Sequence, residues 1–123
     1  MNVAVIGASS DRTKFGNKAV RAYRAQGHTV FPVNLHEDRI EDLDVYRSVE
    51  DVPAGLDAIL VYLPPATTLQ VLPGIARKGA AEVYLNPGSE SAEAVSRARE
   101  LGIEPILACS IIAVGETPAR YGP

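Results

Sequence analysis

The stretch best suited to bind a ligand is a loop of small, hydroxylated and basic residues near the N-terminus. It follows the apolar run Val3–Ile6 and ends where a helical pattern opens. A buried strand, a turn of small residues and a helix start together present backbone N–H groups to a phosphate. We predict an anion site here, with Arg12 and Lys14 reaching a second phosphate. Its candidate residues are Gly7, Ala8, Ser9, Ser10, Arg12, Lys14 and Gly16.

This loop departs from the glycine pattern of dinucleotide-binding domains. The positions two and five residues after Gly7 hold Ser9 and Arg12 instead of glycine. In those domains an acid after the second strand binds the ribose hydroxyls. Here Asn34 stands at that place, and acids appear only from Glu37 onward. The alternative interpretation is that Gly7 only permits a tight turn.

Apolar strand patterns alternate with helical patterns along the chain. Strands are expected at 3–6, 29–33, 57–62, 82–85 and 104–108, with a short edge strand at 45–46. Helices are expected at 15–26, from Thr67 or Thr68 to 78 with Pro73 as a kink or start, at 92–101, and as one turn at 48–52 capped by Ser48. The tail 111–123 is left unassigned. This alternation predicts an α/β fold: a doubly wound, mainly parallel sheet of five to six strands, Rossmann-like, with helices on both faces.

Four further stretches follow predicted strands and should open on the same sheet edge as the first loop, because ligands bind at the carboxyl ends of parallel strands. Tyr62, followed by Leu63 and a proline pair, would form a rigid apolar wall for a flat base. These stretches contribute the candidates Pro32, Val33, Asn34, Tyr62, Leu63, Pro64, Asn86, Gly88 and Cys109. Each also has a structural interpretation: Tyr62 as an edge aromatic, Asn86 and Gly88 as a turn, and Cys109 as a small apolar residue.

The composition limits the classes of function. A chain of 123 residues with net charge -3 suits one domain, residues 1–123, and disfavours a nucleic-acid partner. No apolar run approaches the roughly 20 residues of a membrane span, and no signal peptide is expected. A single cysteine excludes an internal disulfide and a cysteine metal cluster. Neither His28 nor His36 is placed near Cys109, so no catalytic group and no metal site is predicted, and a cytoplasmic location is expected.

Three segments carry a resemblance to a known family. Val5–Ser9, Val30–Asn34 and Tyr62–Pro65 resemble the small stand-alone CoA-binding proteins. That domain is similar to the N-terminal domain of the succinyl-CoA ligase α subunit and of ADP-forming acyl-CoA synthetases. The resemblance implies coenzyme A as ligand, with the nucleotide phosphates at the glycine loop and the adenosine along Pro32–Asn34. Leu63 departs from the arginine that stand-alone members commonly carry before the proline pair.

Three functional hypotheses follow. The first is a domain that binds CoA or an acyl-CoA without catalysis, the pantetheine arm running toward Asn86–Gly88 and Cys109. The second is a small NAD(P)-binding oxidoreductase. The third is a redox-responsive module in which Cys109 pairs with the CoA thiol or another chain. The apolar pair Ile111-Ile112 is a candidate interface for a homodimer or a partner protein.

Overall fold

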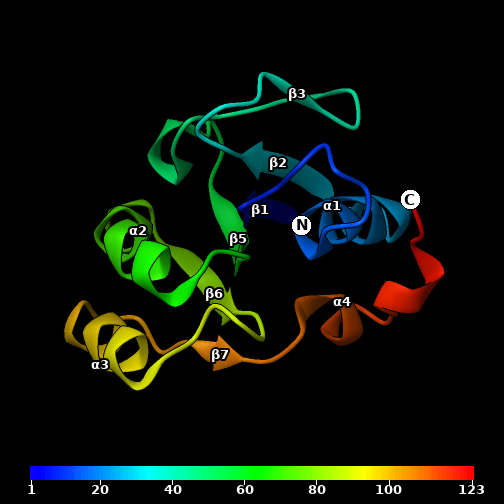
Figure 1. Cartoon of the computed structure of the whole chain (residues 1–123). Helices are drawn as coiled ribbons and strands as arrows, with labels where there is room; N and C mark the ends of the chain where they lie inside the picture. Colours follow the sequence, from blue (N-terminus) through cyan, green and yellow to red (C-terminus); the bar gives the residue numbers. More distant parts are fainter.

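The computed structural model describes all residues, 1–123, as an α/β fold built on one parallel sheet (Figure 1). The sheet has five strands in the order β2-β1-β5-β6-β7, and every neighbouring pair is parallel. The strands are β1 (Asn2–Ile6), β2 (Thr29–Val33), β5 (Leu56–Val61), β6 (Ala80–Leu85) and β7 (Ile106–Leu107). Strand order reverses between β1 and β5, so the doubly wound, Rossmann-like prediction is confirmed.

Helices cover both faces of the sheet (Figure 1). One core layer joins the sheet to α2 (Pro65–Lys78) and α3 (Ala92–Glu100), and the other joins it to α1 (Phe15–Ala25) and α4 (Ser110–Ala113). The central strands are apolar on both faces because both faces are covered: Val3, Ala4 and Val5 are fully buried. The predicted alternation therefore accounts for all five strands of the main sheet, and the candidate loops follow their carboxyl ends.

The edge beyond β2 differs from the prediction. Residues 45–46 do not form a strand; Tyr46 makes only an isolated parallel bridge to Val33. The preceding segment instead forms the antiparallel hairpin β3 (Arg39–Ile40) and β4 (Leu43–Asp44). Pro32 lies inside β2, paired with Val5, and its carbonyl accepts a hydrogen bond from the Tyr46 amide at 3.0 Å. A proline is accommodated because β2 is an edge strand of the main sheet.

The start of α2 also differs from the prediction. α2 begins at Pro65, ahead of Thr67 and Thr68, because a proline suits the first helical position. The helix continues through Pro73, which is therefore not its start. Phe15 begins α1 but does not belong to its apolar face: the side chain is 57% exposed. The turn at Val49–Asp51 (η1) has Ser48 at its cap position, although the Ser48 hydroxyl bonds the Asp51 carboxylate and no backbone amide.

The C-terminal segment is ordered against α1. It contains α4 and a 3₁₀ turn, η2 (Pro118–Arg120). Glu116 is buried and anchors the segment through hydrogen bonds from Gln26, Arg120 and Tyr121. The Tyr121 ring also faces the Arg21 guanidinium at 5.5 Å. A carboxylate with three donors is preferred in its charged form.

Acid is accordingly expected to release this segment. Hydrogen bonds from Gln26 and Tyr121 hold the pKa of Glu116 below its ordinary 4.5. Because the folded pKa is lowered, the stabilisation is complete above the ordinary value and is lost as pH falls through the folded one. Urea unfolding of the wild type and of Glu116→Gln should therefore differ at about pH 7, and the difference should shrink as the pH falls below the ordinary pKa of the carboxyl group. Glu104→Gln, which breaks an exposed pair with Arg99, should show little such dependence.

Candidate functional site

The glycine loop between β1 and α1 is folded tightly against the strand ends. Gly7 has φ +88°, and its amide donates to the Val33 carbonyl at 3.1 Å. A Cβ on Gly7 would lie 2.2 Å from the Tyr62 carbonyl oxygen, and a Cβ on Gly16 would lie 2.2 Å from the Gly7 carbonyl oxygen. Glycine is needed at both positions. At Gly7 the positive φ disfavours a side chain, and at Gly16 the close approach of the Gly7 carbonyl leaves no room for one. The loop and the start of α1 are thereby brought into contact.

The amides of this loop fall into two groups. Those of Ser10, Asp11 and Thr13 donate to side-chain oxygens, and that of Lys14 donates to the Asp11 carbonyl. The amides of Ala8, Ser9, Arg12, Phe15 and Gly16 make no hydrogen bond within the protein. Phe15 and Gly16 open α1, where unpaired N–H groups and the helix dipole favour an anion. Part of the predicted phosphate loop is open, and part is internally satisfied.

Asn34 joins the end of β2 to the glycine loop. Its side-chain amide donates to the Ala8 carbonyl at 2.8 Å, and its carbonyl oxygen accepts from the amides of His36 and Glu37 at 2.7 and 3.1 Å. This amide both donates and accepts, which an ionised acid at the same position could not do. The asparagine that replaces the ribose-binding acid thus has a structural role in fixing the loop.

A cavity of about 380 Å³ opens beside the glycine loop, between the end of β2 and α2. Of the predicted candidates it is lined by Gly7, Val33, Asn34 and Leu63. The other lining residues come from β1, the segment after β2, η1 and α2: Ile6, Leu35, His36, Arg47, Ser48, Val49, Glu50, Thr67, Gln70, Val71, Gly74 and Arg77. An apolar floor with polar groups at its rim suits a flat, partly polar ligand.

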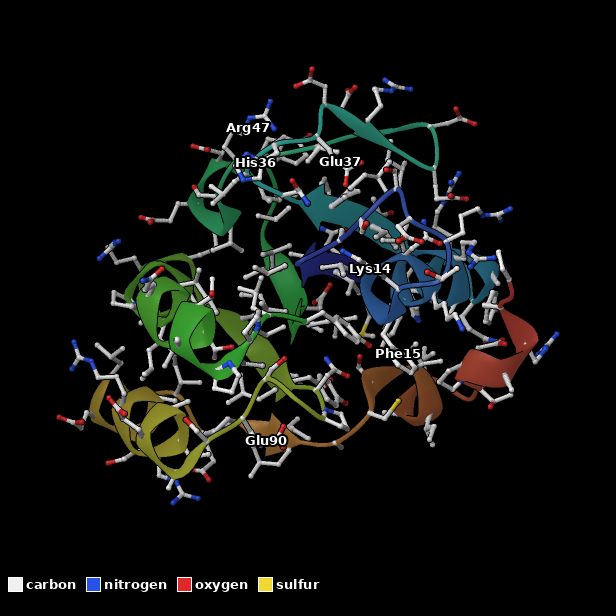
Figure 2. The ribbon with its side chains drawn as sticks, viewed as in Figure 1. Lys14, Phe15, His36, Glu37, Arg47 and Glu90 are labelled. Carbon is white, nitrogen blue, oxygen red and sulfur yellow. The ribbon has the colours of Figure 1, made fainter.

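Charged groups at the rim of the cavity are already paired. Arg77 donates twice to Glu50, at 2.9 and 3.1 Å. These bonds hold the pKa of Glu50 below its ordinary value and raise the pKa of Arg77. Arg47 donates to the carbonyls of Asn34 and Glu37 and pairs with Asp38. Figure 2 shows His36, Glu37 and Arg47 together above the end of β2.

Several predicted candidates lie outside this cavity. Tyr62 packs with the α1 and α4 layer, and its hydroxyl lies 2.7 Å from the Ser110 hydroxyl. Asn86 is buried and bonds Val61 and Ser110. The remaining candidates lie at the carboxyl edge but do not line the cavity: Ala8, Ser9, Ser10, Arg12, Lys14, Gly16, Pro32, Pro64, Gly88 and Cys109. Burial raises the pKa of Tyr62, so its hydroxyl stays protonated at neutral pH.

The α2 side of the cavity was not predicted from the sequence. Thr67, Gln70, Val71, Gly74 and Arg77 all face the cavity from this helix. Their spacing of three and four residues places them on one helix face. The sequence did contain a signal for this side of the cavity. In the helical pattern of α2, polar residues and a glycine lie on the helix face next to the apolar face.

A second, shallower depression of about 650 Å³ lies on α3 and β7. It is lined by Glu90, Ser91, Ala92, Val95, Ser96, Arg99, Glu100 and Leu107. Glu90 marks its position in Figure 2, well apart from His36, Glu37 and Arg47. No glycine loop or switch point adjoins this depression, so the cavity beside Gly7 is the stronger candidate.

The sheet order and the loop at the switch point define a protein of the Rossmann-like α/β class. Within that class the chain belongs to the CoA binding domain family, whose model matches residues 1–115. It contains no helix with the length and apolar character needed to cross a membrane.

Relatives and solved structures agree with this family. The chain is 32% identical over 84 residues to the acetate–CoA ligase [ADP-forming] II subunit alpha of Pyrococcus furiosus, covering 68% of this chain and 18% of the relative. It is 30% identical to a trans-feruloyl-CoA synthase from an unknown prokaryotic organism, over 98% of this chain and 16% of the relative. A conserved hypothetical protein from Pyrococcus furiosus superposes with a TM-score of 0.83 at 32% identity, covering 91% and 97% of the two chains. The chain spans less than a fifth of the two curated relatives, so these matches concern the CoA-binding domain and not the reactions of the whole enzymes.

Proposed function

We propose that this chain binds coenzyme A or an acyl-CoA at the carboxyl edge of its sheet and acts as a non-catalytic binding module. The observation that carries this proposal is the open glycine loop beside a cavity at the switch point. The free amides of Ala8, Ser9, Phe15 and Gly16 would receive the diphosphate. The cavity between Val33 and α2 would receive the adenosine.

The surrounding side chains support binding more than turnover. Arg77 and Glu50 neutralise one another at the cavity rim. His28 lies at the opposite end of the sheet, where its Nδ1 is 3.1 Å from the N-terminal amine. Cys109 stands in the α1 and α4 layer, while His36 lines the cavity on the other side. A nucleophile requires an adjacent base, and these groups are not adjacent.

Adding CoA is expected to raise the melting temperature, because a ligand that binds only the native state stabilises it by about 2.7 kcal/mol at a hundredfold excess over Kd. Differential scanning fluorimetry and titration calorimetry at equal concentrations of CoA and NAD⁺ measure this. CoA should shift the transition by several degrees, and NAD⁺ should shift it much less. An unchanged transition at millimolar CoA contradicts the proposal.

Two variants locate the site. Gly74→Leu inserts a side chain from α2 into the cavity, where only the flexible end of Glu50 lies within 3 Å of the new Cβ. It should weaken CoA binding at least about tenfold while leaving the helix intact, since leucine favours helix over glycine. Ser96→Leu places the same side chain in the depression on α3 and should leave binding unchanged. The reverse result moves the site to α3.

A further inference from the structure

The segment after β2 crosses over the glycine loop and is here called the strap, residues 35–46. It contains the hairpin of β3 and β4, which pairs with no strand of the main sheet. Figure 2 shows its Glu37 beneath the hairpin, on the side of the glycine loop. Because ligand phosphates are proposed to bind that loop, the contacts between strap and loop determine whether the site is open.

The first contact places a carboxylate on a loop amide. The Ser10 N–H donates to both oxygens of Glu37, at 3.1 and 3.3 Å. Glu37 is held there by its own backbone: its amide donates to the Asn34 side chain, and its carbonyl accepts from Arg47. A loop amide beside the proposed phosphate site is thus already satisfied by an anion of the chain.

The second contact involves the cation predicted to bind a phosphate. Arg12 Nε lies 3.4 Å from the Glu41 carboxylate, which also accepts from the Asn17 side chain at 3.2 Å. Glu41 has φ 49°, and its carbonyl accepts from Arg24 at 2.7 Å. The tip of the hairpin is therefore fastened to α1, with its acid turned toward the loop.

We infer that the strap is an internal competitor of the ligand, in which the carboxylates of Glu37 and Glu41 occupy two further donors of the phosphate loop, the Ser10 amide and the Arg12 side chain, beside the open amides. This inference rests on the proposed function. Both contacts come from the same segment, and each takes a different donor of the same loop. Carboxylate and phosphate oxygens accept the same charge-assisted hydrogen bonds. Binding of a diphosphate must exchange these bonds and release the strap, so the position of the hairpin reports whether ligand is bound.

Neutralising Glu37 should tighten ligand binding. Glu37→Gln preserves size and the Asn34 and Arg47 contacts of the backbone, but removes the charge that holds the Ser10 amide. The expected result is an affinity for CoA about five- to tenfold higher than that of the wild type. The ligand phosphate then no longer competes with a charged carboxylate for the Ser10 amide. Titration calorimetry at fixed salt measures the change.

Asp44→Asn is the matched control. Asp44 lies on the same strap and is 76% exposed, and its partner is Arg39 at the hairpin, away from the loop. This variant changes the net charge equally, so a general electrostatic effect would tighten both variants alike. Thermal melts establish that each variant is folded. Equal affinities for Glu37→Gln and Asp44→Asn, or weaker binding by Glu37→Gln, overturn the inference and leave the proposed function standing.

Hydrogen exchange tests the release directly. Saturating CoA should speed amide exchange in residues 35–46 of the wild type, while exchange in β5 slows or stays constant. Increased protection of the strap means that Glu37 remains in place and overturns the inference. If Glu37→Gln binds CoA and the wild type does not, the inference is strongly supported. If no variant binds CoA, the proposed function and the inference are both wrong.

Discussion

Gly7→Ala is expected to destabilise the protein severely. At φ +88° an alanine is strained, which costs about 1–2 kcal/mol. Its Cβ would also lie 2.2 Å from the Tyr62 carbonyl oxygen and 3.1 Å from Leu63 Cδ2. The Tyr62 amide donates to the Ile6 carbonyl at 2.8 Å, so the ends of β1 and β5 cannot separate without breaking the sheet. The two effects together amount to about 3–5 kcal/mol, measured by urea unfolding.

Gly27→Ala separates the two causes. Gly27 has φ +84°, close to that of Gly7, but nothing lies within 4 Å of an added Cβ. This variant should lose only the conformational part, about 1–2 kcal/mol. A similar loss for both variants would show that the sheet ends yield to the new atom, and that Gly7 is required for its conformation alone.

The sheet could be predicted because its sequence signal is local and redundant. Strands buried on both faces have continuous apolar sequences. Such runs occur at Val3–Ile6 and in β5. Helical patterns between them require right-handed crossovers, which places all carboxyl ends at one edge. The location of the glycine loop at the strand-order reversal followed from this topology and from no single residue.

The hairpin of the strap could not be predicted, because its strands have two residues each and its turn lacks glycine. Glu41 and Asp42 adopt positive φ values of 49° and 63°. Contacts distant in the sequence maintain this conformation, among them the hydrogen bond from Arg24 to the Glu41 carbonyl. Tertiary contacts here override the local preference of both residues.

The face of the sheet on which Tyr62 lies could have been predicted from the alternation of side chains along the strand. Successive residues at the end of β5 point to opposite faces, so Val61 and Leu63 face the α2 layer and Tyr62 faces the α1 layer. Of the predicted apolar wall, Leu63 lines the cavity and Tyr62 does not; the Tyr62 hydroxyl instead takes part in a polar network with Ser110. That network has a large predicted effect of its own.

Asn86→Ala is expected to release α4 and to destabilise the whole chain. The Asn86 side chain donates to the Val61 carbonyl at 3.1 Å and accepts from the Ser110 amide and hydroxyl at 2.8 and 2.9 Å. Asn86 is 1% exposed and Ser110 is 0% exposed. Alanine leaves the buried Ser110 amide without a partner, while the Val61 carbonyl keeps its bond from the Ser89 hydroxyl and the Ser110 hydroxyl keeps Tyr62. One unsatisfied buried amide and two lost buried hydrogen bonds together predict a loss of about 2–4 kcal/mol.

Ser110→Ala is the graded comparison. It removes one hydroxyl, keeps the amide bond to Asn86, and should cost about 1–2 kcal/mol. Urea unfolding measures both losses, and hydrogen exchange locates them: in Asn86→Ala the amides of α4 should exchange faster than those of β1. If both variants lose the same free energy, the Asn86 bonds to the Val61 carbonyl and the Ser110 amide add nothing to the contribution of the Ser110 hydroxyl, which also bonds Tyr62. A larger loss for Asn86→Ala means that one buried amide ties the ends of β5 and β6 to α4, and thereby fixes the edge on which the glycine loop opens.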